Sequence, residues 1–162
     1  MYRNILVPLD GSELAECVLP HVEAIYRGCQ APNITFLRVI EPMWLPVGTM
    51  SDGSSVYTEE DAERTRQQED SMHESIAEEY LKGIVNRQNI PGAQTVVLTG
   101  KAAETIADYA MENNVDLIIM ATHGRSGISR WVRGSTADKI LHSASMPVLL
   151  VRSPGCGPGA SV

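Results

Sequence analysis

Hydrophobic residues along the chain gather into two kinds of segment, which alternate. The first kind is short, rich in β-branched residues and continuously apolar. Such runs are typical of strands that are buried on both faces of a parallel sheet. Five segments have this character and are predicted to be strands: 5–7, 34–40, 95–98, 117–120 and 148–151.

The second kind of segment repeats its apolar residues at helical spacing. A first helix is predicted after Ser12, a good N-cap, and Pro20 should kink it because proline removes a backbone donor. Further helices are predicted through Ala103–Met111 and from about Gly134 onward. Apolar residues spaced by four predict one more helix, whose polar extension 59–75 could reach into solvent: Met72, Ile76, Tyr80 and Ile84.

Strands that alternate with helices favour right-handed βαβ units. The predicted fold is therefore α/β, a single-domain, open, doubly wound five-stranded parallel sheet. It would be Rossmann-like, with strand order 3-2-1-4-5 and helices on both faces. We expect the domain to cover residues 1–152, with a long loop at 42–58 and a disordered tail at 153–162.

Composition narrows the functional classes. The chain has 162 residues, three cysteines and a formal net charge of −7. A negative field repels nucleic acid and anionic membranes, so we expect neither as a partner. The first residues do not have the pattern of a signal peptide, so we expect none. No apolar run approaches the roughly 18 residues of a membrane span, and the odd cysteine number suits a reducing compartment. The expected location is cytoplasmic, and no metal-ligand spacing among the histidines predicts a metal site.

The segment with the clearest chemical character is 121–136. Its glycines would let backbone N–H groups approach a ligand, and Gly134 and Ser135 lie where a helix should begin, a position that favours phosphate. Arg125, Arg130 and Arg133 add positive charge in a stretch without Asp or Glu. The alternative is a glycine-rich turn with surface arginines, because the segment matches neither a Walker A loop nor a Gly-x-Gly-x-x-Gly fingerprint.

The end of the first predicted strand supports an anion site. In open doubly wound sheets, ligands bind outside the carboxyl ends of strands where the chain order reverses. That rule would place Asp10 opposite the turn from Ala121 to Gly124, where its carboxylate could accept hydrogen bonds from a ribose or base. The alternative for Asp10 is an Asx-turn that closes the loop.

These features together resemble the universal stress protein family, specifically its ATP-binding branch. The resemblance rests on Val7–Ser12, on Ile118–Arg125, on Ser145–Val151, and on Gly124 followed by nine residues and then Gly134-Ser135. It covers nearly all of residues 1–152. One departure is Ala121, where the family pattern has glycine; its methyl group could reduce affinity, although we still expect binding.

The resemblance implies a nucleotide site and a dimer. ATP, or ADP or AMP, would be bound with Mg²⁺ bridging phosphate oxygens, and no residue is assigned a catalytic role. The final strand would pair two copies into a homodimer through Val148, Leu149, Leu150 and Val151. The implied nucleotide-binding residues are Pro8, Leu9, Asp10, Val39, Met120, Ala121, His123, Gly124, Arg125, Gly134, Ser135 and Thr136.

Three functions remain open from the sequence. The first is a nucleotide-binding regulatory protein of the stress response. The second is a slow ATPase or phosphoryl-transfer enzyme in which His123 is a general base, although no partnering acid is visible and a ligand-touching turn residue is the favoured interpretation. The third is a dimeric interaction module in which Ala121 has ended nucleotide binding, with Trp44 and the helix from Glu59 as the partner surface.

Overall fold

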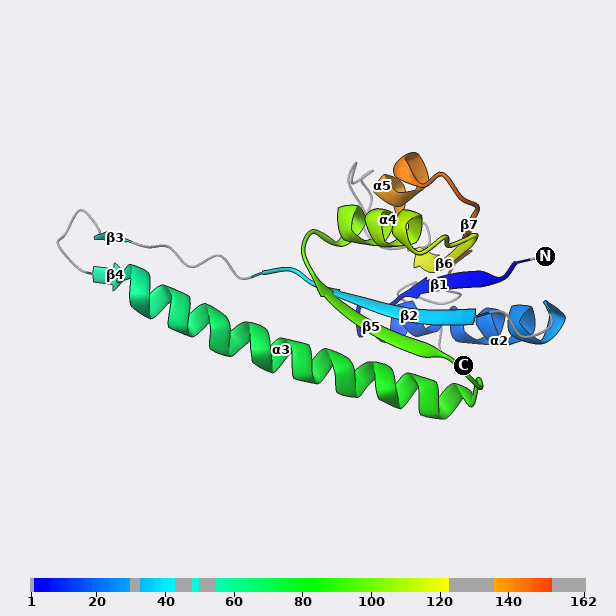
Figure 1. Cartoon of the computed structure of the whole chain (residues 1–162), viewed down its shortest axis with the longest axis horizontal. Helices are drawn as coiled ribbons and strands as arrows, with labels where there is room; N and C mark the ends of the chain where they lie inside the picture. The colour runs from blue at the N-terminus through cyan, green and yellow to red at the C-terminus, as the bar shows by residue number, and fades with distance from the viewer. Residues whose placement is uncertain (1, 30–32, 43–47, 50–54, 123–135, 153–162) are drawn as a thin grey trace, which may run out of the picture.

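A computed structural model describes residues 2–29, 33–42, 48–49, 55–122 and 136–152 (Figure 1). Strands and helices alternate along most of this chain, as the hydrophobic pattern predicts. The elements, in order, are β1 (Asn4–Pro8), α1 (Glu13–Glu16), α2 (Leu19–Gly28), β2 (Asn33–Ile40), β3 (Gly48–Thr49), β4 (Ser55–Tyr57), α3 (Glu59–Gln88), β5 (Gln94–Thr99), α4 (Ala102–Glu112), β6 (Leu117–Thr122), α5 (Thr136–Ser143) and β7 (Val148–Arg152).

Five of the strands form one parallel sheet in the order β5-β2-β1-β6-β7. Counted within this sheet, the order is 3-2-1-4-5, which confirms the predicted topology. Figure 1 shows α4 and α5 on one face of the sheet and α2 and α3 on the other. The prediction of an α/β fold with helices on both faces is therefore confirmed.

Alternate residues of each strand fill two separate hydrophobic cores. Ile5 and Val7 on β1 belong to the core under α1, α2 and α3, which we call the α3-side core. Leu6 between them packs into the core under α4 and α5, called here the α4-side core. Both cores need apolar side chains, so the strands are apolar at successive positions, as expected for a sheet covered on both faces.

The first predicted helix is in fact two helices. Ser12 caps α1, because its Oγ accepts a hydrogen bond from the Ala15 N–H at 3.1 Å. Helix α1 then ends at Glu16, and α2 begins at Leu19 with Pro20 in its first turn. The prediction of a kink inside one helix was wrong, since a proline in the first turn sits where its missing N–H would have no partner.

Helix α3 confirms the predicted polar extension and corrects its apolar face. It runs without a break for 30 residues from an N-cap at Thr58. The side chains of Met72 and Ile76 are 50% and 52% exposed, whereas Leu81 and Ile84 are fully buried. Each step of four residues turns a helix about 40° past a full circle, so Met72 has rotated about 120° away from Ile84.

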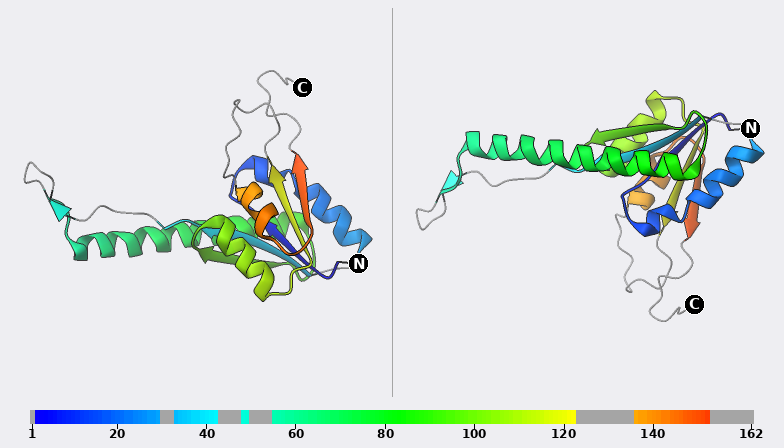
Figure 2. Two further views of the ribbon diagram at one scale, coloured as in Figure 1. Left: turned by 90° about the horizontal axis from the view of Figure 1, so that it is seen from above. Right: turned by 90° about the horizontal axis from the view of Figure 1, so that it is seen from below.

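The region predicted as one long loop, 42–58, contains two short strands. Gly48 pairs with Tyr57 and Thr49 with Ser55 in an antiparallel register. Together with the first half of α3, β3 and β4 extend away from the main sheet (Figures 1 and 2). Residues 43–47 and 50–54 of this region and the tail 153–162 lie outside the described residues.

We predict that only the second half of α3 holds the helix on the domain. Leu81→Ala should lower the free energy of unfolding by about 2–5 kcal/mol, because it leaves a cavity in the α3-side core. Met72→Ala removes a side chain of similar size from an exposed position on the same helix and should change stability by less than about 0.5 kcal/mol. Urea unfolding of both variants would measure the difference, and equal losses would contradict this account of α3.

Candidate functional site

The two central strands stop pairing before they reach their carboxyl ends. β1 pairs with β2 as far as Pro8 and Leu37, and the Leu9 N–H then donates to the Leu37 carbonyl at 2.8 Å. In contrast, the pairing of β1 with β6 covers Ile5 with Leu117 and Leu6 with Ile118. The last residues of β1 therefore follow β2, and those of β6 follow β7. This is the switch point at which open α/β sheets bind ligands.

Several residues predicted for the site come together at this end of the sheet. Pro8 ends β1 and is followed directly by Leu9 and Asp10, while Met120 and Ala121 lie near the end of β6. Because all five strands are parallel, these residues lie at the same edge as Val39 near the end of β2. Thr136 is the first residue of α5. The remaining predicted residues lie outside the described part of the chain: His123, Gly124, Arg125, Gly134 and Ser135.

Asp10 is exposed at the mouth of the switch point and forms a local turn. Its Oδ1 accepts hydrogen bonds from the Ser12 N–H at 2.9 Å and from the Ser12 hydroxyl at 2.6 Å. This is the Asx-turn that the sequence left open as an alternative. Among the described residues both bonds fall on Oδ1, so Oδ2 remains available to a ligand.

The site residues come from both faces of the sheet. Leu9 and Ala121 pack with the α3-side core. Val39 and Met120 pack with the α4-side core. The site therefore lies over the edge of the sheet rather than on one face, and the Ala121 methyl group is accommodated by apolar neighbours of the domain itself.

A charged residue that the sequence analysis did not single out lies beside this site. Arg38 is in β2, and its guanidinium carbon is 5.3 Å from the centre of the Tyr80 ring on α3. A Cβ atom added to Gly11 would lie 3.1 Å from Cζ, Nη1 and Nη2 of Arg38. The available signal was an arginine inside an apolar strand, where a buried charge needs a reason.

The Tyr80 side chain next to Arg38 is uncharged. Burial raises the pKa of the Tyr80 phenol well above its ordinary value, and the carboxylates of Glu16 and Asp10 raise it further, whereas Arg38 lowers it. The phenol is therefore protonated at physiological pH. A neutral ring face attracts a guanidinium cation through its quadrupole.

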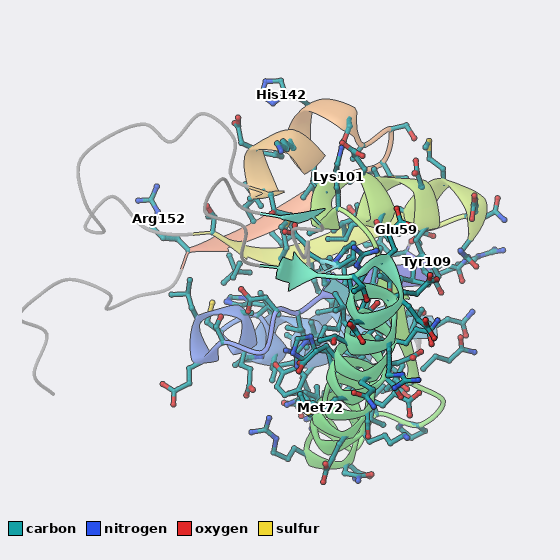
Figure 3. All side chains as sticks on the ribbon, turned by 90° about the vertical axis from the view of Figure 1, so that its left-hand side faces the viewer. Glu59, Met72, Lys101, Tyr109, His142 and Arg152 are labelled. Carbon is teal, nitrogen blue, oxygen red and sulfur yellow. The ribbon has the colours of Figure 1, made fainter. Side chains whose placement is uncertain are left out.

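The described residues were searched for clusters of metal ligands and for membrane-spanning helices. No group of three His, Cys, Asp or Glu side chains there could hold a metal ion. His142 projects from α5, and Arg152 ends β7 at the sheet edge away from α3 (Figure 3). Among the described helices, none is both long and apolar enough to cross a membrane.

A sequence model of universal stress proteins matches residues 1–152. The chain belongs to the universal stress protein family. Universal stress protein MJ0531 of Methanocaldococcus jannaschii is 28% identical over 155 residues, which cover 95% of this chain and 84% of the relative.

Solved structures of universal stress proteins share the fold. The structure of MJ0577 from the same organism superposes with a TM-score of 0.75 at 25% identity, covering 96% of this chain and 99% of that one. A universal stress protein in complex with cAMP gives a TM-score of 0.65 at 15% identity, covering 94% and 98%. The second likeness is one of fold alone.

We predict that Gly11 is required by the turn that presents Asp10. Its φ of +86° lies in the left-handed region, and a Cβ atom would also press on Arg38. Gly11→Ala should therefore lower the free energy of unfolding by about 1–2 kcal/mol. Gly83→Ala is the matched control, because no atom lies within 4 Å of its added Cβ and alanine favours a helix. Thermal unfolding should show a lower midpoint for the first variant and an equal or higher one for the second.

Proposed function

We propose that this universal stress protein binds an adenine nucleotide at the crevice where β1 and β6 part, and that it acts as a nucleotide-dependent regulator. The observation that supports this most directly is the end of β1–β6 pairing after Leu6 and Ile118. The carboxyl ends of these two strands are therefore not paired with each other, and the exposed carboxylate of Asp10 follows β1 while Thr136 begins α5.

Each part of the nucleotide finds suitable chemistry among the residues present. Oδ2 of Asp10 would accept hydrogen bonds from ribose hydroxyl groups, while Pro8, Leu9 and Val39 would frame the adenine and ribose. Met120 and Ala121 would line the β6 side. Phosphate groups would bind at the positive end of the α5 dipole, near Thr136. The sequence adds His123, Gly124, Arg125, Gly134 and Ser135 to this list, and Mg²⁺ would be held by phosphate oxygens.

Alanine at position 121 is compatible with this proposal. The Ala121 side chain packs against the α3-side core, so its methyl group has apolar neighbours within the domain. The family relationship agrees with the proposal, since a universal stress protein of the same fold was solved in complex with cAMP, an adenine nucleotide.

We predict that Mg-ATP stabilises the folded protein. At about 100 times its Kd, a ligand raises the free energy of unfolding by roughly 2.7 kcal/mol, which should raise the melting temperature by about 5–10 °C.

Asp10→Asn should weaken binding of ATP without unfolding the domain, because the amide preserves the turn but lacks the charge. Ala121→Gly should bind ATP within about threefold of the wild type. Thermal scans with ATP, ADP and AMP would measure each shift and the preference among them.

The controls separate this proposal from its two alternatives. If the folded wild type binds no nucleotide but Ala121→Gly does, the interaction module is correct. If ATP binds and phosphate is released, and if His123→Ala ends release while binding is retained, the protein is a slow ATPase. If neither the wild type nor Ala121→Gly binds any adenine nucleotide, nucleotide binding is refuted.

We also propose that two copies pair through β7. This strand is the last of the sheet, and Leu149 on it is 36% exposed. An apolar edge strand with unpaired backbone groups is prone to associate with another strand, and a symmetric pair of such edges would cover both.

We predict that a charge on this edge separates the copies. Leu149→Lys should reduce the mass measured by light scattering from about twice to once the 17.6 kDa of the chain. Leu141→Lys is the control, because Leu141 is an exposed leucine of α5 rather than of the sheet edge. A wild type that is already monomeric at high concentration would contradict the dimer.

A further inference from the structure

Arg38 lies between two surfaces that belong to different parts of the fold. One is the backbone of Gly11, in the turn that follows β1. Cζ, Nη1 and Nη2 of Arg38 would all lie 3.1 Å from a Cβ atom at Gly11. Three atoms of a planar group at equal distance from one point mean that the flat face of the guanidinium lies against the glycine.

The second surface is the ring of Tyr80, 5.3 Å from the guanidinium carbon. This stretch of α3 is anchored in the core, because Leu81 and Ile84 are fully buried. An ion pair at 2.9 Å between Arg87 of α3 and Glu16 of α1 adds a further link between this helix and the β1–α1 region. The Tyr80 ring therefore provides a fixed aromatic surface for the Arg38 guanidinium.

The guanidinium is otherwise uncommitted within the described chain. No described residue forms a hydrogen bond or ion pair with it, although Asp10 and Arg38 both act electrostatically on the same Tyr80 hydroxyl. A half-buried arginine that contacts a glycine with its planar group and lies over an aromatic ring, rather than pairing with an acid, is suited to supporting a backbone turn. The turn that it contacts contains Asp10.

We propose that Arg38 is a positioning residue, which holds the Asp10–Gly11 turn against α3 so that the Asp10 carboxylate meets the ribose hydroxyl groups of a bound nucleotide. This inference rests on the nucleotide binding proposed above. The role belongs to the shape of the side chain as well as to its charge. Lysine would keep the charge but has no planar group to lie against Gly11.

The test compares two ligands that differ only where Asp10 would act. Affinities for Mg-ATP and for 2′,3′-dideoxy-ATP, which lacks both ribose hydroxyl groups, would be measured by calorimetry for the wild type and for Arg38→Met and Arg38→Lys. Hydrogen bonds to a charged group are each worth enough to change affinity about tenfold or more. We therefore expect both variants to weaken ATP binding about tenfold and dideoxy-ATP binding less than twofold.

Two further comparisons locate the effect. In an Asp10→Asn background, Arg38→Met should weaken ATP binding by less than twofold, because the carboxylate that it positions is gone. Tyr80→Leu removes the aromatic ring beside Arg38 and should reproduce the loss of ATP selectivity expected for Arg38→Met. Tyr80→Phe keeps the ring and should bind both ligands like the wild type.

The outcomes distinguish this inference from the proposal on which it depends. A wild type that binds neither ligand refutes nucleotide binding, and the role of Arg38 with it. A wild type that prefers ATP, with Arg38 variants that weaken both ligands equally, refutes the positioning role alone. Should Arg38→Met not fold, Tyr80→Leu compared with Tyr80→Phe decides the question, and an unchanged ATP preference in both would overturn the inference.

Discussion

The parting of β1 and β6 is the constraint on which the rest of the molecule depends. From β1 the chain crosses to β2 and then β5 on one side, and it returns to β6 and then β7 on the other. Consecutive crossovers in a parallel sheet keep one hand, so reversing the direction of winding places helices on opposite faces. Helices α2 and α5, which follow β1 and β6 in the chain, therefore lie on opposite faces of the sheet, and β1 and β6 pair only through Ile5–Leu117 and Leu6–Ile118.

A ligand site at the carboxyl edge of the sheet needs walls that hold their shape. The Asp10–Ser12 turn provides one wall, because Oδ1 of Asp10 binds both the N–H and the hydroxyl of Ser12. The left-handed φ of Gly11 is a local cost of this turn, and glycine is the residue for which that cost is smallest. Helix α3 reaches the same turn from outside through Tyr80 and Arg38, so a helix far along the chain helps to define the wall.

The sequence predicted those features that follow from burial alone. Runs such as Ile5–Val7 are apolar because two cores need them, and this determined the strands and the fold class. It could not predict the break between α1 and α2, since Pro20 is compatible with a kink as well as with a first turn. Met72 and Ile76 were wrongly predicted to share the buried face of α3. A spacing of four residues is typical of a helix, but over several steps the side chains rotate away from the core. The contacts of Arg38 could not be predicted for a different reason. They join β2, the turn after β1 and helix α3, which only the tertiary fold brings together.

An acidic chain that binds an anionic ligand requires its charges to be unevenly distributed. Between Glu59 and Glu79 there are nine carboxylates and two arginines, so this stretch of α3 carries a formal charge of −7, equal to that of the whole chain. Its first half extends away from the sheet beside β3 and β4 (Figure 2). Fields from exposed charges decay over about 8 Å at physiological ionic strength, and 20 helical residues span about 30 Å. The remainder of the chain is neutral overall, so the net charge of the protein does not oppose a phosphate group at the switch point, where three arginines lie in the adjoining sequence.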